Sequence, residues 1–387
     1  MSLSRRALFA REPRSSANLR QLISARGREA LVAELGPGGG EAGLIPAPQA
    51  GEIRLTSNEN PLGPFPASME AIHDGFAGAG RYPMNVQPSM DDLTKALADR
   101  IGCSTDNIVL GAGSGEILKT VAQAFTGPDR HLVQASPTYA QTGRVATYLG
   151  AEVKAIAVTA DGMLDLDAMA EAARGAGLVF FCNPNNPTGT VHTAADVRRF
   201  VDTVQRTSPE TVIHLDEAYH EYVTHPDYES AAGMAVESEN VFVSRTFSKC
   251  FGMAGMRVGY GIGSGRTVEK LQSLALTVNI AVPTLAGAYV ALQDPAREVQ
   301  ERERNTEART YTVGFFNGMG YDVMRSDTNF IFVNIGGPAA EFRSACREHG
   351  VGVGRNFPPM EQTHARISIG TLDEMQRACG VFKQVLA

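Results

Sequence analysis

The sequence is poor in cysteine: it has five among 387 residues, and no two of them form a C-x-x-C pair. An odd number without paired spacing is not typical of a disulfide framework or a zinc site. The cysteines therefore predict buried thiols in a reducing compartment. Cys250 has a second interpretation, as a reactive thiol, because it adjoins Lys249, a candidate functional residue.

The chain also has no excess of basic residues and no long apolar run. Acidic side chains outnumber Lys and Arg by 42 to 35, which gives a formal net charge of −7. Nucleic acid and anionic membrane surfaces are therefore not expected as partners, because both attract basic proteins. No stretch is apolar over the length of a membrane span. With 43% hydrophobic residues, the sequence predicts a soluble globular protein with a large core.

The first residues imitate a twin-arginine export signal, because an Arg-Arg pair at positions 5–6 precedes small and apolar residues. Such a signal continues into a longer apolar region. Charged residues such as Arg11 and Glu12 follow here instead, so we expect no export and a cytoplasmic protein. Residues 1–52 are interpreted as an N-terminal arm with a Gly- and Pro-rich linker.

Three short apolar runs in the middle of the chain each end in polar residues. Leu178–Cys182 runs into NPNNPTG, Val212–Leu215 into DEAY, and Val241–Val243 into SRTFSK. Such runs indicate buried strands, and helical stretches such as Ala194–Gln205 separate them. The alternation predicts an α/β fold with a mostly parallel sheet flanked by helices. Ligands bind outside the carboxyl ends of such strands, so the three polar segments are expected to share one crevice.

Lys249 follows the third of these strands and stands between small hydroxyl residues. A buried amine at a strand end can bond covalently to an aldehyde. The hydroxyls of the stretch could grip a phosphate together with Arg257, because arginine binds phosphate through a fork of charge-assisted hydrogen bonds. These hydroxyls belong to Ser244, Thr246 and Ser248. On this stretch alone, a solvated surface lysine is an equal alternative.

The other two strand ends supply an amide, a carboxylate and a phenol. An ionised Asp216 would keep a pyridine nitrogen protonated, so that the ring acts as an electron sink. Asn186 and Tyr219 could donate hydrogen bonds to a ring phenolate. Together with a lysine, this set fits pyridoxal phosphate.

A glycine-rich turn, GAGSGE, spans residues 111–116 between a predicted strand and a predicted helix. Glycines there let backbone N–H groups approach a phosphate, and a helix N-terminus favours negative charge. The turn lacks the complete dinucleotide pattern and the lysine of a Walker loop. A plain tight turn explains it equally well.

Eight motifs resemble those of a known family and follow its order. They are SNENPLGP (57–64), RYP (81–83), GAGSGE (111–116), SPTY (136–139), NPNNPTG (183–189), DEAY (216–219), SRTFSKCFGMAGMRVGY (244–260) and ARISIGT (365–371). The chain resembles the class I/II aminotransferases of fold type I and, within them, the histidinol-phosphate aminotransferases. The resemblance covers about residues 53–371 and depends on the order of the motifs, since each alone is weak.

The resemblance implies an enzyme that uses pyridoxal 5'-phosphate. It would move an amino group from histidinol phosphate or an amino acid to a 2-oxo acid such as 2-oxoglutarate. Lys249 is implied as the catalytic residue and covalent anchor. The implied cofactor contacts are Gly113, Ser114, Gly115, Tyr139, Asn186, Asp216, Tyr219, Thr246, Ser248, Lys249, Arg257 and Tyr82, and the implied substrate contacts are Asn58, Arg355 and Arg366. No metal is expected.

Four of these assignments depend most on the resemblance. It implies that Tyr139 stacks on the pyridine ring, and that Tyr82 reaches the neighbouring subunit's cofactor phosphate in a homodimer. It implies that Arg366 binds a substrate carboxylate or helps to bind histidinol phosphate, and that Arg355 binds the substrate phosphate. Taken singly, Tyr139 is typical of a half-buried core residue. Arg366 alone is typical of an exposed strand edge, and Arg355 alone of a plain surface position.

The domain organisation is predicted from the same reading. Residues 81–285 form a large cofactor-binding domain, and residues 53–80 with 286–387 form a small α+β domain. A long helical run is expected from about Val268. Within residues 296–316 a helix is predicted whose charged face is solvated. That face comprises Arg297, Glu301, Arg304 and Glu307.

Alternatives remain open at the level of the reaction. The same scaffold carries decarboxylation, elimination and oxidation, and a fold does not fix its chemistry. His220 replaces a usual apolar residue after DEAY, which suggests a site adapted to an aromatic or other amino acid. A non-enzymatic module, such as the sensor half of a transcription regulator, is disfavoured by the acidic charge and the short N-terminal segment.

Overall fold

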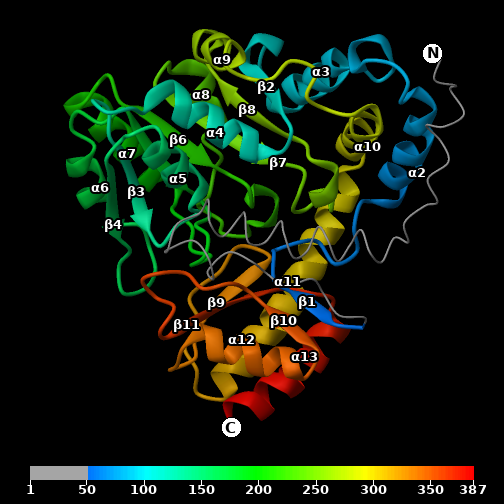
Figure 1. Ribbon diagram of the computed structural model, residues 1–387, viewed down its shortest axis with the longest axis vertical. Helices are drawn as coiled ribbons and strands as arrows, with labels where there is room; N and C mark the ends of the chain where they lie inside the picture. Colours follow the sequence, from blue (N-terminus) through cyan, green and yellow to red (C-terminus); the bar gives the residue numbers. More distant parts are fainter. Residues whose placement is uncertain (1–50) are drawn as a thin grey trace, which may run out of the picture. The chain divides into compact units, whose positions relative to one another are not determined.

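The structure is a computed structural model that describes residues 51–387 (Figure 1). The export-like start and nearly all of the predicted N-terminal arm lie outside the described residues. None of the helices within the described part combines the length and the hydropathy that a membrane-spanning helix requires.

Seven strands form one sheet, and helices alternate with these strands along the chain, which confirms the predicted α/β class. From edge to edge they are β2 (Ile108–Gly111), β8 (Gly259–Gly263), β7 (Val241–Thr246), β6 (Val212–Asp216), β5 (Leu178–Cys182), β3 (Leu132–Ser136) and β4 (Val153–Ala157). Strands β7, β6, β5, β3 and β4 are parallel, whereas β8 is antiparallel to both of its neighbours. The sheet is therefore mostly parallel, as predicted.

Helices cover both faces of this sheet because alternate side chains of each buried strand point to opposite sides. On β5, Val179 and Phe181 belong to one hydrophobic core, and Phe180 and Cys182 belong to another. The first core includes residues of α3 (Met90–Ile101), α6 (Leu166–Ala172), α7 (Ala194–Thr207) and α8 (Ala232–Glu237). The second includes residues of α4 (Ser114–Phe125), α5 (Gln141–Tyr148) and α9 (Gly265–Gln272).

Several helices begin where the sequence supplies a capping box, in which two side chains bond reciprocally to free backbone N–H groups. Ser89 and Asp92 cap α3 in this way, and Thr193 and Asp196 cap α7. Helix α3 then ends at Gly102, whose φ of 81° suits the left-handed turn that closes a helix. These local signals explain why α3 starts at Met90 and why α7 starts at Ala194, as predicted.

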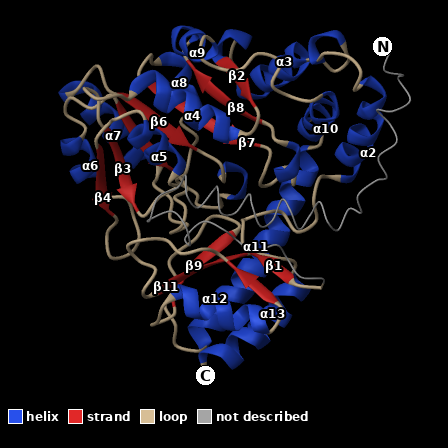
Figure 2. Cartoon of the chain, viewed as in Figure 1, coloured by secondary structure: helices blue, strands red, loops and turns tan. Residues whose placement is uncertain are grey.

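The remaining strands form two small sheets that lie apart from the large one (Figure 2). Strand β1 (Ile53–Leu55) pairs in parallel with β10 (Val351–Val353), and β9 (Phe330–Asn334) pairs antiparallel with β11 (His364–Ser368). They share a core with α11 (Pro295–Gly318), α12 (Ala339–Glu348) and α13 (Leu372–Leu386). By contrast, α2 (Pro66–Gly75) packs against α10 (Val282–Leu292) and contributes to the core of the large sheet. The domain boundaries stay a prediction.

Two helix predictions need correction. The run expected from Val268 is interrupted, because residues 273–281 separate α9 from α10. The charged face of α11 is not fully solvated. Glu301 is only 4% exposed, and its carboxylate accepts hydrogen bonds from the Tyr222 hydroxyl and the Arg304 guanidinium. Charge alone predicted solvent there, but buried partners compensate the charges.

Candidate active site

The carboxyl ends of β5, β6 and β7 bring three predicted site residues together, as expected for a parallel sheet. Asn186 follows β5, Asp216 ends β6, and Lys249 follows β7. Strand register places Asp216 opposite Ser244 of β7 and Cys182 of β5. The polar segments that the sequence suggested for one crevice therefore meet.

Asp216 is buried at 3% exposure and accepts a hydrogen bond of 2.8 Å from the Ser244 hydroxyl. Burial raises the pKa of Asp216 to about 6, and the Ser244 hydrogen bond opposes that rise. The nearby Lys249 charge also favours the ionised carboxylate. A cation placed against this carboxylate would relieve the cost of its burial.

His214 extends the hydrogen-bond chain behind Asp216. Its Nε2 lies 2.9 Å from the Ser244 oxygen. Because Ser244 donates its own proton to Asp216, the imidazole must donate through Nε2–H. Burial lowers the pKa of His214 to about 3, so the ring is neutral. Ser244 thus serves the carboxylate, whereas the sequence had grouped it with the phosphate-binding hydroxyls.

Lys249 is not the solvated surface lysine of the alternative interpretation. Its Nζ donates to the Ser57 carbonyl at 3.1 Å and lies 5.7 Å from the centroid of the Tyr219 ring. Burial of the amine lowers the pKa of Lys249 to about 8, and the positive charge of Arg366 adds to this effect. The neutral amine, which is the nucleophile and base, is therefore accessible near physiological pH.

Tyr219 receives two amide hydrogen bonds at its hydroxyl. Asn58 donates through Nδ2 at 2.9 Å and Asn186 through Nδ2 at 3.2 Å. Burial raises the pKa of Tyr219, so the phenol keeps its proton. Since its oxygen already accepts twice, that proton is free to be donated to a ligand. Asn58, which has a φ of 55°, is placed by a hydrogen bond from its N–H to Ser368.

Arg366 lies inside the site and not at an exposed edge. It is 6% exposed and donates to the Asn186 side-chain oxygen at 2.9 Å and to the Thr56 carbonyl at 2.7 Å. Its Nε is buried without a partner among the described residues. Burial lowers the pKa of Arg366 to about 10. The guanidinium also lies 4.7 Å from the centroid of Phe357.

Arg355 shares the Phe357 ring with Arg366, because its guanidinium lies 4.3 Å from the same centroid. It is half-buried and donates to the Asn356 carbonyl at 3.0 Å. Burial lowers the pKa of Arg355, and the charge of Arg144 adds to that effect. Within residues 51–387, neither Arg355 nor Arg366 forms an ion pair with a carboxylate. Two cationic groups therefore stand together without compensation.

The glycine-rich turn lies beside Arg257. Gly113 has a φ of 79° and precedes α4, and a β-carbon at this position would collide with the Arg257 guanidinium. Arg257, itself at a φ of 57°, lies 3.5 Å through Nη1 from the Ser248 hydroxyl, which also accepts from Thr246 at 2.9 Å. A helix N-terminus, an arginine and two hydroxyls thus converge, as the sequence suggested.

Tyr139 lies within range of the Asp216 charge and of three arginine charges. Burial raises the pKa of Tyr139, the Asp216 charge adds to the rise, and the charges of Arg144, Arg355 and Arg257 oppose it. Its hydroxyl donates to the Gln141 side-chain oxygen at 3.3 Å, and Gln141 donates to the Gly115 carbonyl at 2.5 Å. The ring is thus tied to the glycine-rich turn.

Tyr82 is the one predicted contact that lies elsewhere on the described chain. It is 70% exposed and lines a hollow formed by residues 79–84 and 277–283. None of the other predicted site residues lines this hollow.

The residues of the site fit pyridoxal 5'-phosphate. A buried carboxylate suits the pyridine nitrogen, and a phenol with a free proton suits the ring oxygen. Arg257 and the start of α4 suit the phosphate. An amine with a lowered pKa suits the aldehyde. No described group of His, Cys, Asp and Glu could hold a metal ion.

Sequence reasoning missed several residues that support the site. His214, Ser368 and Phe357 act through Asp216, Asn58 and the two arginines respectively. His214 carried a weak signal, because a histidine within a buried apolar run needs hydrogen-bond partners inside the protein. Ser368 lies within the ARISIGT motif, but its contact with Asn58, 310 positions away, had no signal in the sequence.

Comparison with known proteins places this geometry in context. Residues 50–382 match the family described as "Aminotransferase class I and II". The histidinol-phosphate aminotransferase of Moorella thermoacetica is 35% identical over 87% of this chain and 86% of its own length.

Two solved structures are also similar. A putative histidinol-phosphate aminotransferase from Erwinia carotovora atroseptica has a TM-score of 0.82 and 27% identity, over 88% of this chain and 98% of its own. The Sinorhizobium meliloti histidinol-phosphate aminotransferase, solved in complex with pyridoxal-5'-phosphate, has a TM-score of 0.79 and 25% identity, over 89% and 95%.

Proposed function

Because the chain belongs to the class I and II aminotransferases and is a pyridoxal-phosphate-dependent enzyme of fold type I, we propose that it transfers the amino group of histidinol phosphate to a 2-oxo acid such as 2-oxoglutarate. The observation that carries this proposal is the uncompensated pair Arg355 and Arg366 on the ring of Phe357. Both substrates bear anionic groups, and such groups would neutralise these arginines. The named relatives support the choice of donor.

Bound pyridoxal phosphate supplies an electron sink for negative charge that develops at the substrate Cα. Asp216 would hold the pyridine N–H through its ionised carboxylate, which Ser244 keeps in place. Tyr219 would donate its free proton to the ring oxygen. Arg257 and the first turn of α4 would hold the phosphate, and Tyr139 would support the ring.

Lys249 would anchor the cofactor covalently. Its neutral amine would also accept the proton from the substrate Cα and, once protonated, donate it in turn. A pKa of about 8 suits both directions, because neither protonation state is strongly disfavoured near neutral pH. The hydrogen bond to the Ser57 carbonyl marks a resting position for the released amine.

The two arginines divide the substrate groups between them. Arg366, inside the site, would bind the carboxylate of the 2-oxo acid, and Arg355, half-buried beside it, would bind the phosphate of histidinol phosphate. His220 gives no reason for a different donor. Its Nδ1 lies 3.1 Å from the Tyr228 hydroxyl, and the charges that act on it are those of Arg245, Arg100 and Arg302, not those of Arg355 and Arg366.

A panel of amino donors with 2-oxoglutarate tests the proposal. We expect histidinol phosphate to have the highest kcat/KM, with a keto product and no release of ammonia. Arg355→Ala should lower kcat/KM for histidinol phosphate about ten- to a hundredfold, because it deletes a charge-assisted contact. The same variant should change little with phenylalanine, which has no phosphate.

Arg325→Ala, at a mostly exposed arginine, is the matched control and should leave both donors unaffected. Equal losses with both donors, or no activity of the parent enzyme on histidinol phosphate, would favour an aminotransferase for other amino acids. Release of ammonia without a keto product from transfer would favour elimination or oxidation.

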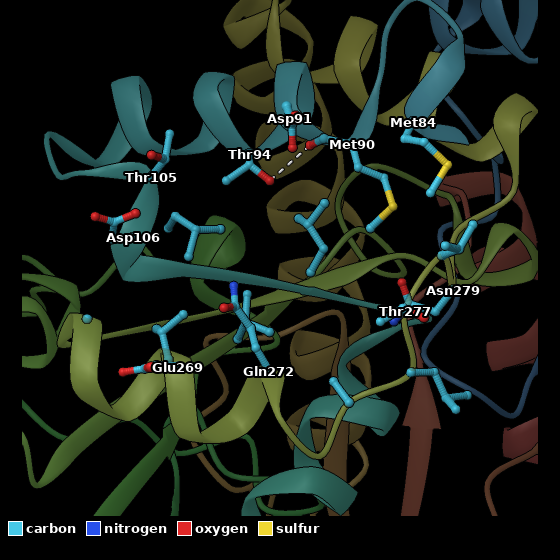
Figure 3. Close-up of a pocket in the computed structure, with 18 residues that line it drawn as sticks. Met84, Met90, Asp91, Thr94, Thr105, Asp106, Glu269, Gln272, Thr277 and Asn279 are labelled. Carbon is cyan, nitrogen blue, oxygen red and sulfur yellow. Dashed lines mark hydrogen bonds between the residues drawn. The ribbon is translucent and has the colours of Figure 1, made fainter. Parts of the chain in front are cut away.

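We also propose a homodimer in which Tyr82 reaches the cofactor phosphate of the partner subunit. Its support is an exposed apolar surface formed by Tyr82, Met84 and Leu276, which are 70%, 53% and 73% exposed. Met84 also lines the pocket of Figure 3. Tyr82→Phe should weaken cofactor retention by about 1 kcal/mol, one phenolic hydrogen bond. A fully active monomer in sedimentation experiments would contradict the dimer. A cytoplasmic location stays a prediction.

A further inference from the structure

Glu116 joins the glycine-rich turn to a loop far away in the sequence. Its Oε2 accepts hydrogen bonds of 2.7 Å from the Ala112 N–H and 2.7 Å from Asn279 Nδ2. Its Oε1 accepts a hydrogen bond of 3.2 Å from the Leu276 N–H. One carboxylate therefore holds the turn and both sides of the loop at residues 276–279.

The loop that Glu116 holds contains a strained residue. Val278 has a φ of 58°, in the left-handed region that a β-branched side chain rarely enters. Such a conformation persists only where its surroundings fix it. The two loop contacts of Glu116 lie on either side of Val278, at Leu276 and Asn279. The carboxylate is thus placed to hold this conformation.

The same loop reaches the surface of the molecule. Leu276 is 73% exposed, and residues 275–279 line a pocket of about 890 Å³ between α3, β2 and α9. Figure 3 shows Thr277 and Asn279 at the same end of this pocket as Met84. Residues 277–279 also line the hollow beside Tyr82. Glu116 is therefore the link between this surface loop and the turn.

Inside the turn, the contacts of Glu116 determine which N–H groups can face an anion. The Ala112 N–H is taken by Glu116, and the Gly113 N–H is taken by the Gly111 carbonyl at 2.8 Å. The first N–H groups of a helix have no acceptor within it, so those of Ser114 and Gly115 point out of α4. Ala112 lies two residues before Ser114, so its hydrogen bond to Glu116 restrains the backbone that leads into these two groups.

We propose that Glu116 is a positioning residue for the cofactor phosphate, which acts by clamping the glycine-rich turn to the strained loop at 276–279. The proposal rests on the proposed role of the first turn of α4, through the N–H groups of Ser114 and Gly115, in holding the phosphate. Glu116 itself touches no phosphate. Its loss should therefore weaken the grip on the phosphate and leave the contacts to the pyridine ring intact.

Binding of two related ligands to the cofactor-free full-length protein tests this role. Pyridoxal 5'-phosphate and pyridoxal differ only in the phosphate, and both report their binding by absorbance. Glu116→Ala should raise the Kd for pyridoxal 5'-phosphate about tenfold and change the Kd for pyridoxal less than about twofold. Glu116→Gln keeps one acceptor oxygen and should lie between the parent and Glu116→Ala.

Two further variants keep the test decisive if Glu116→Ala folds poorly. Asn279→Ala removes one donor from the carboxylate and should raise the Kd for pyridoxal 5'-phosphate about threefold, again without effect on pyridoxal. Asn107→Ala is the matched control: Asn107 also donates through Nδ2, to the Gly263 carbonyl at 2.9 Å, and forms no hydrogen bond with the turn. It should affect neither ligand.

An equal weakening of both ligands in Glu116→Ala would show a general structural role and overturn the inference, as would no change for either. The parent protein should bind pyridoxal 5'-phosphate more tightly than pyridoxal, and Arg257→Ala should reduce that difference. If the parent bound both ligands with the same Kd and Arg257→Ala changed neither value, the proposed phosphate site would itself be wrong. The clamp can thus fail while the phosphate site stands, and the two failures are distinguishable.

Discussion

Asp216 and Glu217 are adjacent carboxylates with opposite surroundings. Glu217 accepts from the Arg245 guanidinium at 3.0 Å, and from the hydroxyl and the N–H of residues 230–231 at 2.8 Å each. Asp216 accepts a hydrogen bond from Ser244, and within residues 51–387 no cation is bonded to it. Strand geometry explains the difference, because neighbouring positions at a strand end point to opposite sides.

The same contrast separates the active site from the packing behind it. Behind the site, Arg100 forms a bidentate pair with Glu298 at 2.6 and 2.5 Å, and Arg245 pairs with Glu217. In the site, Lys249 and Arg366 lack such a carboxylate partner among the described residues. Structural charges are thus neutralised by the fold, whereas the charges of the site remain available to cofactor and substrate.

The largest effect is expected from removing the site's amine. Lys249→Ala should lower kcat by about a thousandfold or more, because it removes both the covalent anchor and the proton carrier. Absorbance of the bound cofactor and turnover with histidinol phosphate measure the two losses. Lys270→Ala, at an exposed lysine on α9, should retain both. Substantial turnover by Lys249→Ala would show that Lys249 is not the proton carrier.

A matched pair of arginine variants sharpens the comparison between the two regions. Arg245→Met leaves Glu217 buried without its cation and should cost about 3–5 kcal/mol of unfolding free energy. Arg366→Met removes a buried charge that has no carboxylate partner, so it should change stability by about 1 kcal/mol or less. Urea denaturation of the cofactor-free proteins gives both values. A larger loss of unfolding free energy in Arg366→Met than in Arg245→Met would contradict the difference between paired structural charges and unpaired site charges.

The sequence was informative about the site because several site residues lie at, or a few positions after, the ends of strands that could be predicted. The apolar runs before NPNNPTG, DEAY and SRTFSK predicted β5, β6 and β7 within one or a few residues, and the parallel order then placed Asp216 and Lys249 together. The antiparallel direction of β8 could not be predicted, because an apolar strand carries no mark of its direction.

Contacts between distant segments were the part that the sequence could not supply. Ser244 looks like one more hydroxyl beside Thr246 and Ser248, and only the pairing of β6 with β7 turns it toward Asp216. Glu301 was assigned to solvent because charged residues usually lie there. Its hydroxyl partner, Tyr222, is 79 positions away in the sequence and became visible only in the fold.

The pH dependence of stability tests most directly whether the fold leaves the Asp216 charge uncompensated. The folded pKa of Asp216 is raised to about 6 from an ordinary value of 3.8, so the folded state binds this proton more tightly than the unfolded state does. The group therefore stabilises the cofactor-free protein at low pH, and that stabilisation is lost as the pH rises through about 6.

The measurement is the unfolding free energy of the cofactor-free parent and of Asp216→Asn, each at pH 5 and pH 8. The neutral amide removes this titration, and groups that do not interact with Asp216 cancel in the comparison; the coupled Lys249 is held constant by making both proteins in a Lys249→Met background. Relative to the parent, Asp216→Asn should gain about 1 kcal/mol on going from pH 5 to pH 8. A difference that is independent of pH, or a relative loss at pH 8, would show that the fold itself compensates Asp216 and would contradict the account.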